Sequence, residues 1–343
     1  METKREPGID LLRIVGMLFV VSVHQFLYNG FYSQPQTGFV MWAADCFRWL
    51  FVCCNGIFMM LSGYLHSEKP FTFKYYRGLV PLLIGYFLCC VVIFPLQSRL
   101  INEELSFSQW MEKLVGFGNY AWYLEMHIGL ILISPVLNLG LRQIRDEKTL
   151  WGMAGIFFLL TGLPSLTAWN IALDYWTCLY PITYYVLGAA IRRTRPEVRV
   201  WQGLGAAALI CMGLAVTTLL TAPKGFSSGY SQGYGGFWVT LIALCVFLGL
   251  YRVQPGEKAG RLLAWASGGC FEGYMLSLIP DLWAYGLVSQ WHTPRKWPLV
   301  YLCVTIPIFL TSLLAGKLIH TFAGHITRCL PGFRVKRNGK PKT

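Results

Sequence analysis

The feature that most constrains this chain is its series of long apolar runs. A transmembrane helix needs about 20 consecutive, mostly apolar residues, and runs of that size follow one another along the sequence. Their pattern predicts an all-α integral membrane protein, a polytopic bundle of about ten transmembrane helices. We place the spans near residues 9–29, 43–65, 79–97, 120–139, 151–169, 176–192, 201–221, 236–251, 262–288 and 298–319.

Composition supports the same class. Hydrophobic residues make up 55% of the chain and charged residues 13%, whereas soluble globular domains carry about 25% charged residues. The first run is too long for a signal peptide and no small-residue cleavage site follows it, so we expect a retained helix. The eleven cysteines show no C-x-x-C and no metal-ligand spacing, which favours reduced thiols and no metal site. We expect one domain over residues 1–343.

The net charge of +13 follows the predicted topology. Lys and Arg concentrate in alternate loops, which is the positive-inside pattern and predicts that both termini are cytoplasmic. The basic tail, residues 321–343, should then lie on the inner leaflet. The charge therefore indicates contact with anionic lipid and not with nucleic acid. The richer loops hold Lys69, Lys74 and Arg77; Arg142, Arg145 and Lys148; Arg192, Arg193, Arg195 and Arg199; and Arg252, Lys258 and Arg261.

Two segments between the spans have a character of their own. Residues 101–113, INEELSFSQWMEK, are typical of a short amphipathic helix that lies at the membrane interface. Residues 223–236 are rich in Gly, Ser and Tyr and should form a flexible outer loop. That composition suits polar contacts to a sugar, but it is equally how chains turn.

Ionisable residues inside a bilayer are costly, so each one suggests a function. Arg13 and His24 are eleven residues apart in the first span, which puts both side chains on one helix face about 16 Å apart along the axis. Arg binds phosphate through its planar fork, and neutral imidazole is a general base near neutral pH. An Arg near a helix end also snorkels to the interface, and a lone His also bonds a neighbouring helix. Spacing alone leaves both interpretations open.

Four segments carry a resemblance to one family. The stretch from Arg13 to His24 matches an R-x10-H signature and follows GIDLLR, and the second span ends in FMMLSGYL. The fourth begins NYAWYLEMHIGLILISPVLN, and CFEGYMLSLIPD stands late in the chain. In this order, these segments resemble the membrane acyltransferase-3 family over the whole length. Ser277 and Asp281 resemble one subgroup in place of the more common His, and Glu125 and His127 stand where other members keep paired acids.

The resemblance implies O-acyl transfer, usually of acetyl, from cytoplasmic acyl-coenzyme A to a sugar hydroxyl. The acceptor would be a cell-surface glycan or a lipid-linked sugar. Acyl-coenzyme A would be a substrate, with no permanently bound cofactor, and the expected location is the plasma (inner) membrane of a bacterium. Candidate catalytic residues are His24, Glu125 and Asp45; donor-binding candidates are Arg13 and Arg77; substrate-binding candidates are Tyr64, Trp122, Tyr123, Ser277 and Asp281.

Within this set, a chemical role can be stated for His24 but not for each of its neighbours. His24 would accept the proton of the attacking hydroxyl or take the acyl group itself. Glu125, Asp45 or Tyr64 could orient its imidazole, and the sequence does not rank them. The main alternative to an enzyme is a transporter or flippase for a glycan or small solute, which internal repeats would support; none is visible. A structural scaffold is the third interpretation, and it would not require Arg13 and His24 to share a face.

Overall fold

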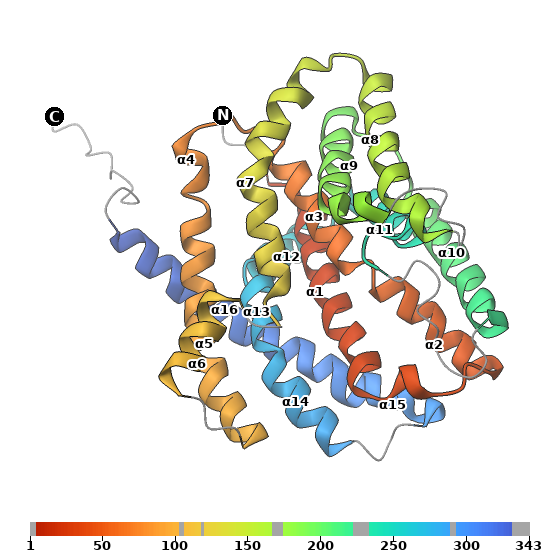
Figure 1. Cartoon of the computed structure of the whole chain (residues 1–343), viewed down its shortest axis with the longest axis vertical. Helices are drawn as coiled ribbons and strands as arrows, with labels where there is room; N and C mark the ends of the chain where they lie inside the picture. Colours follow the sequence, from red (N-terminus) through yellow and green to blue (C-terminus); the bar gives the residue numbers. More distant parts are fainter. Residues whose placement is uncertain are drawn as a thin grey trace.

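Helices form every regular element in the described part of the chain (Figure 1). The computed structural model describes residues 5–102, 106–117, 120–166, 174–221, 233–288 and 293–330. The α-helices are α1 (Pro7–Tyr28), α2 (Gly38–Phe51), α3 (Cys54–His66), α4 (Phe73–Tyr76), α5 (Leu79–Ile101), α6 (Phe107–Val115), α7 (Trp122–Gln143), α8 (Glu147–Gly162), α9 (Tyr180–Thr194), α10 (Val200–Thr221), α11 (Phe237–Leu250), α12 (Glu257–Ser267), α13 (Cys270–Leu276), α14 (Leu278–Leu287), α15 (Trp297–Val300) and α16 (Ile306–Cys329).

Within these residues, six helical segments are long and apolar enough to cross a membrane: Pro7–Tyr28, Gly38–His66, Phe73–Ile101, Trp122–Gln143, Val200–Thr221 and Trp297–Cys329. The helices α8, α9 and α11 coincide with three more predicted spans but have only 16, 15 and 14 residues. The chain is therefore an all-α, multi-pass membrane protein. The count of ten spans and the side of each terminus stay predictions.

Two predicted spans are interrupted. The span expected at 43–65 consists of α2 and α3, with a break at Val52 and Cys53. The span expected at 262–288 consists of α12, α13 and α14, with breaks at Gly268–Gly269 and at Ser277. Irregular backbone at membrane depth is tolerated where it is buried in protein or lines a cavity. Val52 and Gly268 both line the large cavity described below.

The outer faces of several long helices are apolar and exposed. Such a surface is unfavourable in water and matches the hydrocarbon of a bilayer. In Figure 1, α1 runs through the middle of the molecule, while α5 and α10 lie at opposite sides of it. Exposed side chains of this kind include Phe87 and Val91 on α5, Leu132 and Val136 on α7, Leu209 and Leu220 on α10, and Leu310 and Leu318 on α16.

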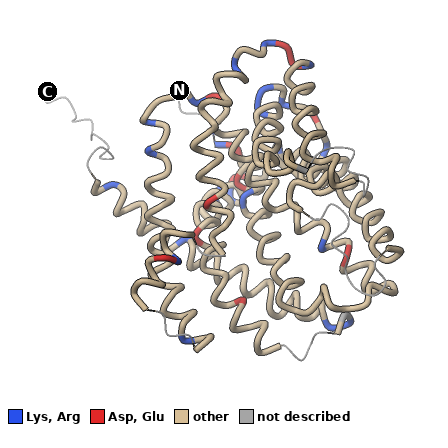
Figure 2. Tube along the Cα trace, viewed as in Figure 1, with Lys and Arg blue, Asp and Glu red and all other residues tan. Residues whose placement is uncertain are grey.

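The smaller segments follow the sequence in part. The predicted interfacial helix is α6, which begins with a capping box between Ser106 and Gln109. The helix α16 continues to Cys329, so the described start of the predicted basic tail is helical. The rest of that tail, and residues 223–232 of the predicted outer loop, lie outside the described residues. Lys and Arg gather at the loop between α7 and α8 and at the end of α9 (Figure 2).

Close contact between α3 and α9 depends on two glycines. A Cβ atom on Gly63 would overlap with the carbonyl of Tyr185, and one on Gly188 would overlap with the carbonyl of Met60. Small residues at such crossings let helix backbones approach closely inside a membrane. This contact fixes α3, which carries one wall of the cavity.

Gly188→Ala should therefore lower the thermal midpoint of the purified protein by several degrees, since overpacking typically costs about 1–3 kcal/mol. Gly155→Ala is the matched control, because a Cβ there meets nothing within 4 Å and Ala is the better helix former. The measurement is a melting curve in detergent. Equal midpoints for the two variants would contradict the assigned α3–α9 contact.

Candidate active site

One large cavity of about 1540 Å³ penetrates the helix bundle. Its walls come from α1, α3, α5, α6, α7, α13 and α16, so segments far apart in the sequence meet around it. Arg13 and His24 of α1 both line it. The expectation that these two side chains share one helix face agrees with this arrangement.

His24 is held by a buried carboxylate. Its Nδ1 lies 2.7 Å from Oδ2 of Asp281 on α14. The Asp281 side chain is fully buried, whereas 13% of the His24 side chain is exposed. A carboxylate that accepts the Nδ1 proton of a histidine fixes the ring orientation and makes Nε2 the basic nitrogen. The pair therefore gives the cavity an oriented imidazole.

Tyr120 completes this cluster. Its hydroxyl donates to Oδ2 of Asp281 at 3.3 Å and lies 3.3 Å from Nδ1 of His24. The same hydroxyl is 2.7 Å from Oγ of Ser277, which in turn donates to the carbonyl of Tyr274 at 2.9 Å. The Tyr274 hydroxyl donates to the carbonyl of Tyr120, and the two rings stack with centroids 5.4 Å apart. The cluster is thus cross-linked between the start of α7 and the α13–α14 junction.

Sequence reasoning missed Tyr120 as a site residue and gave Asp281 and Ser277 a different role. Both were expected to bind substrate, but they lie behind His24 and are fully buried. Ser277, directly before α14, and Asp281 in its first turn are four residues apart, so their side chains lie on the same side. That spacing was available as a signal; the approach of Tyr120 from the turn before α7 was not.

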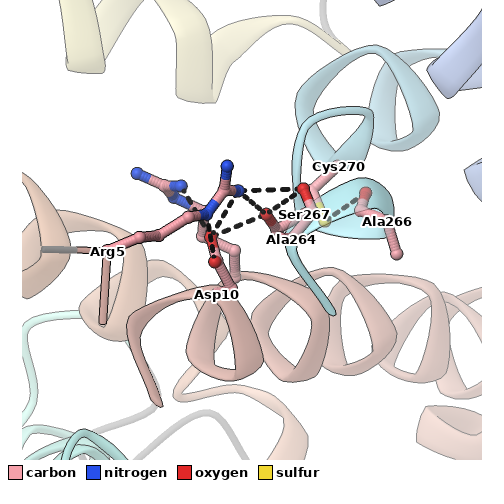
Figure 3. A network of polar contacts seen from close by, with 7 residues as sticks. Arg5, Asp10, Ala264, Ala266, Ser267 and Cys270 are labelled. Carbon is pink, nitrogen blue, oxygen red and sulfur yellow. Dashed lines mark hydrogen bonds and ion pairs between the residues drawn. The ribbon is translucent and has the colours of Figure 1, made fainter. Parts of the chain in front are cut away.

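The other end of α1 carries a second polar network (Figure 3). Asp10 is buried, and its carboxylate pairs with Nε of Arg5 at 2.6 Å and with Nη1 of Arg13 at 3.2 Å. Oγ of Ser267, at the end of α12, donates to Asp10 at 2.7 Å. The Arg13 side chain keeps 35% of its surface exposed. It is therefore anchored on one side and open to the cavity on the other.

These contacts show how α1 lies along the broken helix α12–α14. Asp10 meets Ser267 near one end, and His24 meets Asp281 near the other. Between them, a Cβ atom on Gly273 would come within 2.6 Å of Cε of Met17. Residue numbers rise together on both segments, so the two run side by side in the same direction.

Aromatic and polar side chains line the cavity near His24. Trp122 and Tyr123, both expected to bind substrate, face it from the first turn of α7. Trp122 stacks on Tyr234 with ring centroids 4.9 Å apart, and Tyr234 lines the cavity as well. Arg48 adds a buried cation to the same wall. Such a surface can hold a polar, ring-shaped ligand.

The remaining candidates do not lie on the cavity wall. Glu125 is exposed on α7, and Arg77 is exposed at the end of α4. Asp45 is fully buried on α2, beside Arg48. The Tyr64 hydroxyl donates to Oε2 of Glu6 at 2.6 Å. None of the three residues considered for orienting His24, namely Glu125, Asp45 and Tyr64, contacts it; Asp281 occupies that position.

Glu6, Tyr64, Arg192 and Arg195 form a polar cluster, the Glu6 cluster, that joins the start of α1 to α9. Its carboxylate is 3.1 Å from Arg192 and 3.0 Å from Arg195. Burial alone would raise the pKa of Glu6, but the hydrogen bond from Tyr64 and the charges of Arg195 and Arg192 outweigh it and lower that pKa. Because the pKa of Glu6 is lower in the folded state than in the unfolded state, the ionised carboxylate stabilises the fold at any pH above the unfolded-state pKa. This stabilisation is lost as the pH falls through the folded-state pKa.

Acidification from about pH 6 to about pH 3 should therefore lower the melting midpoint of the wild type more than that of Glu6→Gln, because the unfolded carboxyl titrates near pH 4.3. Glu147→Gln, at an exposed position, is the control and should follow the wild type. If the melting midpoints of the wild type and Glu6→Gln fall equally with pH, the Glu6 cluster adds no stability.

No group of three His, Cys, Asp or Glu side chains in the described residues is arranged to hold a metal ion. In a comparison with known protein families, a family model described as an acyltransferase domain, of the acyltransferase-3 type, matches residues 6–317. Searches of curated proteins and of solved structures gave no significant match. The matched range contains the whole cluster around His24 and, from the second network, Asp10, Arg13 and Ser267; Arg5 lies one residue before it.

Proposed function

The chain belongs to the membrane acyltransferase-3 family, and from that premise we propose that it moves an acetyl group from cytoplasmic acyl-coenzyme A to a hydroxyl of a cell-surface or lipid-linked sugar, in the inner membrane of a bacterium. The observation that carries this proposal is the His24–Asp281 pair at the cavity wall. An acyl transfer to a hydroxyl needs a base within reach of that hydroxyl. The pair supplies one at the wall of a cavity of about 1540 Å³.

The donor lies along α1 in this proposal. Arg13 lines the cavity about 16 Å along the helix axis from His24. Its guanidinium binds a phosphate of the nucleotide, and Asp10 holds it in place. The long, thin arm of coenzyme A then extends toward His24 and brings the thioester to the imidazole. Arg77, exposed at the end of α4, is not needed for this arrangement.

The acceptor approaches from the aromatic wall. Trp122, Tyr234 and Tyr123 provide flat surfaces for a sugar ring, and Arg48 provides a cation for an acidic group on it. Nε2 of His24 takes the proton of the acceptor hydroxyl as its oxygen attacks the thioester carbonyl. The C–O bond forms, the C–S bond breaks, and the departing thiolate takes the proton back from Nε2. Asp281 stabilises the imidazolium between these two steps.

Removal of the base should abolish transfer. His24→Ala should reduce label transfer from acetyl-labelled acetyl-coenzyme A into glycan by about 10²- to 10⁴-fold, the usual contribution of a general base. Membrane vesicles with matched amounts of protein, supplied with a glycolipid and polysaccharide extract, provide the assay. His325→Ala is the matched control, because His325 is exposed on α16 and does not line the cavity. Equal incorporation by both variants would refute the role of His24.

Two further substitutions separate positioning from donor binding. Asp281→Asn should lower kcat with little change in the KM for acetyl-coenzyme A, since an amide cannot stabilise the imidazolium. Arg13→Ala should chiefly raise that KM, by about 10- to 100-fold, because a hydrogen bond to a charged group contributes about 1.5–3 kcal/mol. Arg261→Ala, at an exposed ion pair on α12, is its control. An unchanged KM in Arg13→Ala would contradict the placement of the nucleotide.

A further inference from the structure

A second carboxylate, on a residue of the cavity wall, has an unpaired oxygen. Glu272 on α13 lines the cavity and is only 3% exposed. Its Oε1 lies 3.0 Å from Nδ1 of His320 on α16. Its Oε2 is buried and has no hydrogen-bond partner among the described residues. The mechanism above makes no use of this group.

An arrangement of this kind is costly without a ligand. A buried carboxylate oxygen that has lost its water needs a donor, and leaving it unpaired costs about 1–3 kcal/mol or more. On its other side the carboxylate packs closely against α5, because a Cβ atom on Gly85 would lie 2.8 Å from Oε1. A residue of the cavity wall therefore carries a carboxylate oxygen that lacks an N–H or O–H donor.

The register of α1 against α12–α14 locates this acceptor. Glu272 is next to Gly273, which lies at the level of Met17. Met17 is four residues after Arg13 and seven before His24, or about 6 Å and 10 Å along the helix axis. Glu272 thus lies at a level between the residue proposed for the donor phosphate and the proposed base.

The chemistry of the donor at this level is distinctive. Between the phosphate and the sulfur of coenzyme A stands the pantetheine arm, which is uncharged and carries two amide N–H groups and one hydroxyl. A carboxylate oxygen would repel phosphate, but it is a strong acceptor for an N–H or O–H. Resting on the proposed function, we propose that Oε2 of Glu272 accepts a hydrogen bond from the pantetheine arm and sets how far the thioester extends toward His24.

His320 positions the carboxylate in this assignment. Its Nδ1–H donates to Oε1, which leaves Oε2 as the unpaired oxygen. The His320 side chain is 47% exposed, while that of Glu272 is 4% exposed. Replacement of the half-exposed histidine is therefore a milder change to the fold than replacement of the buried glutamate.

The proposed donor and a shortened analogue of it distinguish the contact at Glu272 from the phosphate contact at Arg13. Binding of acetyl-coenzyme A and of S-acetylpantetheine, which lacks the nucleotide, is measured by calorimetry on the purified protein in detergent. Glu272→Gln should weaken both ligands by about tenfold or more, as expected for a hydrogen bond to a charged group. Arg13→Ala should weaken only acetyl-coenzyme A. Glu257→Gln, exposed on α12, should change neither.

His320→Ala tests the same contact should Glu272→Gln fail to fold, and it should weaken both ligands by a smaller factor. Kinetics add a second measure: the KM for the donor should rise in Glu272→Gln while kcat at saturation changes little. The inference is overturned if both variants bind S-acetylpantetheine like the wild type, or if only acetyl-coenzyme A is affected. Failure of the wild type to bind either ligand would instead refute the proposed donor, and this inference with it.

Discussion

The side-by-side packing of α1 on the broken helix α12–α14 is the constraint on which the rest of this site depends. Inside a bilayer, a charged or polar side chain must find its partner within the protein. Asp10 finds Ser267 at one end of this contact, and His24 finds Asp281 at the other. Because both ends are fixed, the distance between the Arg13 end and His24 is set by helix geometry and not by a flexible loop. Because both residues line the cavity, this separation also sets the distance between these two parts of its wall.

Much of the architecture could be predicted from the sequence, and the reason is physical. Apolar runs of bilayer length have few alternatives to a transmembrane helix, so the spans at α1, α5, α7 and α10 were located to within a few residues. The last span, predicted at 298–319, was placed less well, because its helical segment runs from Trp297 to Cys329. The eleven-residue spacing of Arg13 and His24 is a property of one helix and needs no tertiary information. The interfacial helix α6 was similarly local, since its polar and apolar residues alternate at helical spacing.

Contacts between helices could not be predicted from the sequence, because the uniform apolar character that makes the spans easy to find hides which face of each helix packs inward. In an almost uniformly apolar helix, periodicity does not show which face turns inward. Glu125 and Tyr120 are close in sequence, yet Glu125 is exposed and Tyr120 reaches the His24–Asp281 pair. Tyr64 has the family's Ser-Gly-Tyr context but bonds to Glu6. Breaks within predicted spans, such as that at Val52–Cys53, carried no clear sequence signal either.

The carboxylates of two carboxylate–histidine pairs lie on α13 and α14, and they differ in how they are buried. In the His24–Asp281 pair, the carboxylate is fully buried behind the ring, so only the imidazole lines the cavity. In the His320–Glu272 pair, Glu272 itself lines the cavity and has an unpaired carboxylate oxygen. Nine residues separate Asp281 from Glu272, which on a helix is half a turn out of phase. The α13–α14 segment can thereby orient the base His24 on α1 with one side, while its other side carries the acceptor Glu272, which packs against α5 and α16.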